Sequence, residues 1–309
     1  MGDGWERFWF RSTTANTLAL VRILYGITLI GWTGSMLPDL VTFFSPTPRG
    51  IVTPALARSG GWSVFTWFPS EAVLWLGFAG LLVAAVAVTV GFFPTPAAAV
   101  AWVLLVSFQH RNQYLLNSGD FVVRDLALLL ALCPSGAALS VDRWRRTGRD
   151  GFWTSPSVPQ WGLRLIQIQA SLVYFFSFWN KTGMAWRGGS ATSTAWRLTD
   201  LQRFAVPDAL QRNLWLSTLA GWGTLAVELS LGVLVWNRKW RWWALAGGLL
   251  LHITIDLTIL VGFFSWGMVC ALTSFVPPET SDRFVAWVRS GLSRTRERSI
   301  PLSTPEVLP

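Results

Sequence analysis

The sequence predicts an all-α integral membrane protein, a polytopic bundle of about eight transmembrane helices. Of its 309 residues, 52% are hydrophobic and only 13% are charged, and the mean hydropathy is +0.42. Soluble domains carry about 25% charged residues. Several apolar runs also reach the ~20 residues that a helix needs to cross a bilayer. The lipid bilayer is therefore the first partner that we expect.

Eight apolar runs are expected to span the membrane, and in chain order they are 16–37, 71–93, 96–108, 121–139, the middle of 161–186, 213–236, 242–261 and 263–276. The first covers about 33 Å as a helix. It lacks the exit of a cleaved signal peptide, so we expect it to remain. A tight GFFPTP turn joins the second and third runs, and a Pro-Ser-Gly sequence ends the fourth. The last two divide at Gly262, because 242–276 is too long for one span.

The basic residues predict that both chain termini face the cytoplasm. With eight spans, the basic clusters all fall on one side, which the positive-inside rule assigns to the cytoplasm; they lie at 7–11, 143–149, 238–241 and 289–298. The loops 38–70 and 181–212 and the polar stretch 110–125 would then meet outside. Residues 1–276 form the expected transmembrane domain and 277–309 a basic cytoplasmic tail, so we expect a multi-pass protein of the cell membrane.

The net charge of +9 does not indicate a nucleic-acid partner, because the basic clusters lie between apolar runs. The chain has two cysteines and two histidines, which are too few and too scattered for a disulfide framework or a metal centre. No metal is expected. Arg22, Arg164 and Glu228 lie in the inner half of their spans, and we expect an ion pair among them, because a bare guanidinium at this depth costs several kcal/mol.

One helix face in the run 161–186, WGLRLIQIQASLVYFFSFWNKTGMAW, is polar. Steps of seven back from Lys181 give Tyr174 and Gln167, which share a face with about 20° of drift per step. Trp186 follows one turn later. Two interpretations are open. Lys181 could reach the headgroup region while the others bond neighbouring helices, or all four could line a site.

Two further stretches carry candidate site residues. LLLHITIDL places His252 and Asp256 at i and i+4 on one helix face. Ionisable residues inside a membrane are functional candidates, although such a pair can also simply satisfy itself. From their depth we expect both to share a cavity with Lys181. The polar stretch QHRNQYLLNSGDFVVRD adds further candidates for substrate binding, which are Asn112, Gln113, Asn117 and Asp120.

Four motifs in order, RNQYLLNSGD, QIQASLVYFFSFWNKTGMAW, ELSLGVLVW and LLLHITIDLTILVGFFSWGM, resemble the horizontally transferred transmembrane (HTTM) family over about 14–275. That family includes the membrane domain of vitamin K-dependent gamma-carboxylase. The resemblance implies that Lys181 is the base that deprotonates reduced vitamin K, menaquinol or another quinone-like ligand at the extracytoplasmic side. We take His252 as the second catalytic candidate.

The sequence departs from the carboxylase pattern at two places. Asn112-Gln113 stands where the carboxylase has an asparagine followed by a histidine, and 33 residues follow Val276, where the carboxylase has a large lumenal domain. A separate soluble or membrane partner protein is therefore one expectation. Two functions stay open. The first is a carboxylase- or epoxidase-like membrane enzyme, a lyase or oxygenase. The second is a non-catalytic membrane factor for peptide maturation or export, as in the bacterial sporulation-delaying-protein maturation branch of the family.

Overall fold

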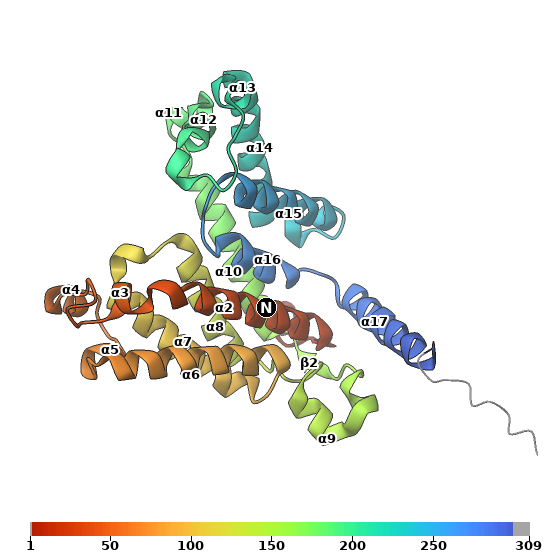
Figure 1. Cartoon of the computed structure of the whole chain (residues 1–309). Coiled ribbons are helices and arrows are strands. Elements are labelled where there is room, and N and C mark those ends of the chain that lie inside the picture. The colour runs from red at the N-terminus through yellow and green to blue at the C-terminus, as the bar shows by residue number, and fades with distance from the viewer. Residues whose placement is uncertain (1, 299–309) are drawn as a thin grey trace, which may run out of the picture.

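The computed structural model describes residues 2–298 and is mostly helical (Figure 1). The expected all-α class is confirmed. A helix overlaps each of the eight expected spans, and these are α2 (Asn16–Ser35), α6 (Glu71–Val90), α7 (Pro94–Arg111), α8 (Ser118–Leu132), α10 (Trp161–Asn180), α14 (Leu214–Gly232), α15 (Arg241–Thr258) and α16 (Phe264–Thr273). Within the described residues, Asn16–Phe44 and Glu71–Val90 have both the length and the hydropathy of a membrane span, and α16 is a shorter apolar helix.

Shorter elements connect these helices. In chain order they are α1 (Gly2–Phe10), β1 (Ser12–Thr14), η1 (Leu37–Asp39), α3 (Leu40–Phe44), α4 (Pro54–Ser59), α5 (Val64–Trp67), η2 (Gln113–Leu115), α9 (Val141–Phe152), β2 (Ser157–Pro159), α11 (Met184–Arg187), α12 (Ser190–Arg197), η3 (Thr199–Leu201), α13 (Asp208–Arg212), η4 (Leu234–Trp236) and α17 (Pro278–Arg298). The strands β1 and β2 pair antiparallel. The predicted cytoplasmic tail is helical as far as residue 298, and its part 299–309 lies outside the described residues.

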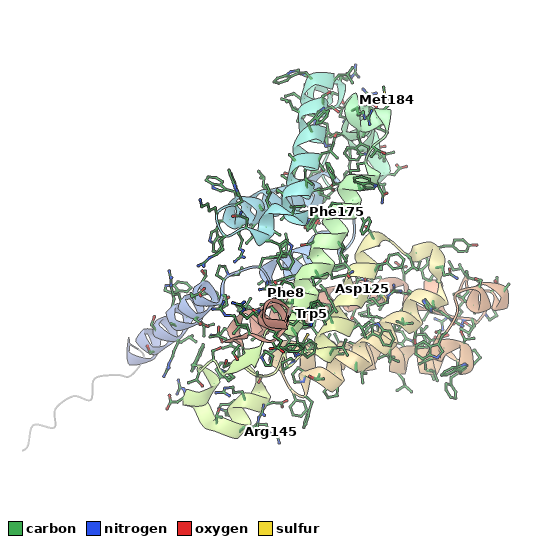
Figure 2. The ribbon with its side chains drawn as sticks, turned by 180° about the vertical axis from the view of Figure 1, so that it is seen from behind. Trp5, Phe8, Asp125, Arg145, Phe175 and Met184 are labelled. Carbon is green, nitrogen blue, oxygen red and sulfur yellow. The ribbon has the colours of Figure 1, made fainter. Side chains whose placement is uncertain are left out.

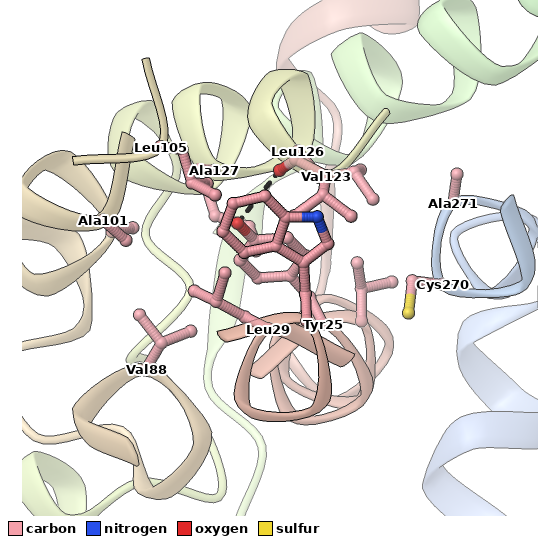
Figure 3. Close-up of a cluster of buried hydrophobic side chains, with 14 of the residues drawn as sticks. Tyr25, Leu29, Val88, Ala101, Leu105, Val123, Leu126, Ala127, Cys270 and Ala271 are labelled. Carbon is pink, nitrogen blue, oxygen red and sulfur yellow. Dashed lines mark hydrogen bonds between the residues drawn. The ribbon is translucent and has the colours of Figure 1, made fainter. Parts of the chain in front are cut away.

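The core of the fold lies where α2 packs against α6, α8 and α16 (Figure 3). Tyr25 and Leu29 of α2 are fully buried there beside Val88 and Leu126. The Tyr25 hydroxyl donates to the carbonyl of Val123 at 3.0 Å. This hydrogen bond satisfies the one polar group of the tyrosine side chain, which is needed because an unpaired buried hydroxyl is costly.

The helices α2 and α6 approach closely at Gly26, so Gly26→Ala is expected to destabilise the protein. A Cβ atom at this position would lie 2.7 Å from the Thr89 backbone, and such overpacking typically costs 1–3 kcal/mol. The matched control is Gly34→Ala in the same helix, where a Cβ would meet nothing within 4 Å. Thermal unfolding in detergent should show a lower melting temperature for the first variant only, and equal melting temperatures would contradict the close crossing.

The prediction of an ion pair between Glu228 and Arg22 or Arg164 is wrong, because Glu228 pairs with Lys181. Arg22 is fully buried, but it donates to main-chain carbonyls, at 3.0 Å to Ser135 and 2.5 Å to Leu139. The segment 133–140, which follows α8, is not helical, so its carbonyls can accept hydrogen bonds from the guanidinium. Arg164 instead donates to the Gln167 side chain at 2.8 Å and lies over the ring of Phe8.

Residues near the chain termini gather at one end of the molecule, on the right of Figure 1. The Asp282 carboxylate of α17 accepts from Asn16 Nδ2 at 2.8 Å, and the Gln160 side chain donates to the Phe8 carbonyl at 2.8 Å. Arg289 pairs with Asp150 of α9 at 3.4 Å. Three of the four basic clusters, those of α1, α9 and α17, therefore lie at this end.

Two of the three segments expected to meet on the outside do pack together. The His110 Nδ1 atom donates to the Trp62 carbonyl at 2.8 Å, and Asn112 Nδ2 donates to the Phe43 carbonyl at 2.9 Å. The third segment, 181–212, packs on α14 and α15 instead. In Figure 1, α11 to α13 lie beside α14 at the top. The helices α2 and α6 run across the picture, whereas α10 and α14 run steeply upward.

Candidate functional site

A cavity of about 550 Å³ lies among α10, α12, α14, α15 and the start of α16. Phe175 on α10 and Met184 on α11 mark this part of the molecule in Figure 2. Most of the wall is apolar, with side chains such as Val173, Val227 and Leu251, and glycines such as Gly223 leave the space open. The volume and the apolar wall are typical of pockets that bind small hydrophobic ligands.

The main polar group in the cavity is a cluster of Lys181, Ser177 and Glu228. Lys181 Nζ donates to Ser177 Oγ and to Glu228 Oε1, each at 2.5 Å, and Ser177 Oγ donates to the same Glu228 oxygen at 2.9 Å. The side chains of Lys181 and Glu228 are 21% and 8% exposed. The Lys181 ammonium also lies 5.2 Å from the ring centre of Trp186. The cluster is therefore an ion pair that is partly shielded from water.

The end of α10 and the packing of α14 against it explain this geometry. Lys181 follows the last residue of α10, so its positive charge lies at the negative end of that helix. Ser177 is one turn earlier on the same face. Glu228 enters from α14, which packs along α10, and its Oε2 atom is buried without a hydrogen-bond partner among the described residues.

A second polar pair lies on the cavity wall. The Tyr174 hydroxyl is 2.5 Å from His252 Nε2, and both side chains are buried. The His252 ring also lies 5.7 Å from the ring of Phe264, and its Nδ1 atom has no partner within residues 2–298. Tyr174 is one turn before Ser177 on α10. The two polar pairs therefore share the α10 side of the cavity.

Four of the predicted site residues line this cavity, and they are Tyr174, Lys181, Trp186 and His252. Asp256 does not line it, so the expectation that it shares a cavity with Lys181 is wrong. Its carboxylate pairs with Arg203 at 3.3 Å, and its main-chain carbonyl accepts from Arg203 at 2.7 Å. Asp256 thus fastens the segment 199–203 to α15. Asp256 and His252 both line a separate cavity of about 260 Å³.

The remaining predicted residues lie elsewhere. Gln167 is buried deeper along α10, where it donates to the Ser274 carbonyl at 2.7 Å and holds α10 against the end of α16. Gln113 is exposed on the surface. Asn112, Asn117 and Asp120 line a second cavity. The neighbouring Ser118 does line the cavity of Lys181.

Sequence reasoning missed Ser177 and Glu228. Ser177 had a local signal, because it precedes Lys181 by four residues and so lies on the same helix face. Glu228 was considered only as a partner for arginine, since no local pattern connects it to Lys181. Within residues 2–298, no group of three or more His, Cys, Asp or Glu side chains could hold a metal ion.

Comparison with known proteins identifies a family. No curated protein and no solved structure matches the chain. A family model described as HTTM domain matches residues 10–279. HTTM domains are transmembrane domains, and the family is associated with vitamin K-dependent carboxylase. Because the match covers most of the 309 residues, this chain is a membrane protein that belongs to the HTTM domain family.

Proposed function

We propose that the chain is a multi-pass enzyme of the cell membrane that binds reduced vitamin K, menaquinol or a related lipid quinol and removes a proton from its hydroxyl group. The observation that supports this proposal is the Lys181–Glu228 pair in the wall of an apolar cavity of about 550 Å³. A lipid quinol has an apolar ring and tail and two polar oxygens. The apolar wall suits the ring and tail. The Glu228 Oε2 and His252 Nδ1 atoms have no partner within residues 2–298, so they can form hydrogen bonds with the oxygens.

Lys181 is the proposed base, with Glu228 as the residue that holds its proton. In the structure Lys181 Nζ donates to Glu228 Oε1. Exclusion of water by a bound ligand disfavours two separate charges and favours the neutral amine and acid. The proton then lies on Glu228, and the amine of Lys181 can accept the hydroxyl proton of the ligand. Ser177 keeps the amine in place.

Tyr174 and His252 are proposed to bind the second oxygen of the ligand. Their hydrogen bond of 2.5 Å lies one helical turn deeper than Ser177. A bound quinol would supply a hydroxyl group whose deprotonation makes the ring reactive toward oxygen. The protein residues orient this ring and move its proton. His252 is therefore a second catalytic residue in this proposal, in addition to Lys181. It transfers a proton to or from the second oxygen.

Filling the cavity tests this proposal. Gly223 of α14 lines the cavity, and a Cβ atom there would meet nothing within 4 Å. Gly223→Phe is therefore expected to fold. It should lower the amount of menaquinone bound per molecule of purified protein about tenfold. Extraction and mass spectrometry measure this amount. Gly34→Phe on α2 is the control, because its Cβ is equally unobstructed. Equal quinone content in both variants, or none in the wild type, would favour a non-catalytic membrane factor.

The same proposal includes eight membrane passes with both termini in the cytoplasm. The helix α16 has 10 residues, which cover about 15 Å and only half of the hydrocarbon core. The residues on either side of α16 lengthen the stretch of chain that can cross the bilayer. The Phe263 ring lies against Gly31 near one end of α2, and Ser281 accepts a hydrogen bond from Thr17 near the other end. Residues 263–281 therefore run along most of α2 and support an eighth pass.

Reporter fusions test this topology. We expect a fusion after residue 205 to label the extracytoplasmic side and a fusion after Arg241 to label the cytoplasm, because Arg238, Lys239 and Arg241 follow the positive-inside rule. In Figure 1, α10 and α14 run steeply relative to α2, so this topology requires them to cross the bilayer at a different tilt from α2. A cytoplasmic signal at residue 205 would mean that these two helices do not cross.

A further inference from the structure

A second cavity, of about 340 Å³, lies among the ends of α2, α7 and α8 and the segment 36–44. It is separate from the Lys181 cavity. Gly119 and Phe264 form part of the wall between them, because a Cβ at Gly119 would lie 2.5 Å from the Phe264 amide nitrogen. Phe263 lines the second cavity and Phe264 lines the first. Occupancy of the second cavity can therefore be tested independently of the proposed function.

The hydrogen-bond donors around this cavity are mostly occupied by protein acceptors. Asp120 accepts from Trp32 Nε1 at 2.7 Å and from the Asn117 amide nitrogen at 2.8 Å. Gln109 Nε2 donates to the Asp120 carbonyl at 2.8 Å, and Asn112 Nδ2 donates to the Phe43 carbonyl at 2.9 Å. The Nδ2 group of Asn117 is the exception, since it has no acceptor among the described residues.

Acceptors remain available in the same cavity. The Gln109 Oε1 atom is buried without a partner among the described residues, and Gln109 as a whole is only 2% exposed. The Asp39 carboxylate lines the cavity as well. A buried amide oxygen without a hydrogen bond is unfavourable. A ligand that donates hydrogen bonds would therefore remove this cost.

The charges and rings around the cavity favour a positive ligand. Asp39 and Asp120 are acidic, and among the described residues no lysine, arginine or histidine lines the cavity. Arg111 is nearby, but its guanidinium donates to the Phe44 and Phe65 carbonyls. The lining also contains five aromatic rings, which are those of Trp32, Phe43, Phe44, Phe108 and Phe263. Faces of such rings attract ammonium groups.

We propose that this cavity is a second binding site, which takes an ammonium group carried on an apolar ring or short chain. The ammonium N–H groups donate to Gln109 Oε1 and to the Asp39 carboxylate, and the carrier packs among the aromatic rings. Nothing in this site depends on the Lys181 cavity. Binding at the two sites can be measured separately, because Gly223→Phe fills only the first.

Calorimetric titration of the full chain in phosphatidylcholine nanodiscs tests the proposal, with empty nanodiscs subtracted. The probes are benzylammonium and benzyl alcohol, which have the same ring and differ in charge. We expect the ammonium to bind about tenfold more tightly, from the sum of one ion pair and one ring contact. Asp39→Asn should reduce this preference about fivefold, since Asp39 is exposed enough for the change to be tolerated.

Two further variants make the result decisive. Phe43→Leu removes one ring and should also reduce the preference for the ammonium. Asp208→Asn is the control, because this exposed carboxylate lies on α13 and pairs only at the surface with Arg212. Equal binding of the two probes to the wild type would overturn the proposal. So would a preference that persists in both Asp39→Asn and Phe43→Leu.

Discussion

Lys181→Met is expected to cause a large loss of stability, because it leaves Glu228 buried without its counter-charge. Removal of one partner of a buried ion pair costs about 3–5 kcal/mol, and the Glu228 side chain is only 8% exposed. Its Oε2 atom already lacks a partner among the described residues. We expect Glu228→Leu to be costly for the same reason. Denaturant unfolding of the purified protein in detergent measures both losses.

The double variant Lys181→Met/Glu228→Leu separates the ion pair from other causes. It removes both charges, so its free energy of unfolding should recover most of the loss that either single variant shows. Ser177→Ala serves as a milder comparison, because it removes a neutral hydrogen-bonding group worth about 1 kcal/mol. Additive losses in the double variant would show that the two residues stabilise the fold separately, which would contradict the pair.

Lys181→Arg is expected to keep the fold and to abolish the proposed proton transfer. Arginine can still pair with Glu228, so the free energy of unfolding should stay close to that of the wild type. It remains charged at any accessible pH and cannot accept a proton. Loss of a general base typically lowers a rate 10²–10⁴-fold. The measurement is the rate at which the protein converts menaquinol or reduced vitamin K under oxygen.

The control for this experiment is Lys239→Arg. Lys239 is the other lysine of the chain, and it lies exposed at the turn before α15. Its replacement should leave both stability and rate unchanged. If Lys181→Arg kept the full wild-type rate, Lys181 would not be a base, and the non-catalytic membrane factor would become the better proposal. A loss of stability in Lys181→Arg would instead show that the site cannot accommodate a guanidinium.

Local sequence patterns determined the helices and part of the site. Apolar runs placed all eight helices, because hydropathy and the spacing of breakers such as Gly91 and Pro134 depend on neighbouring residues alone. The helical period placed Tyr174 and Lys181 on one face of α10, and both line the cavity. Trp186 lies beyond the end of α10, in α11. The sequence therefore determined which residues α10 presents to its neighbours.

The tertiary structure alone decided which residues meet across the fold. Glu228 pairs with Lys181, 47 positions away, and Asp256 pairs with Arg203, 53 positions away. Arg22 needed no carboxylate, because the non-helical segment after α8 provides the carbonyls of Ser135 and Leu139. The physical reason is that the period of a helix sets the direction of a side chain relative to its own axis. Which acceptor or charge satisfies that side chain depends on how distant helices pack, and no local pattern records this.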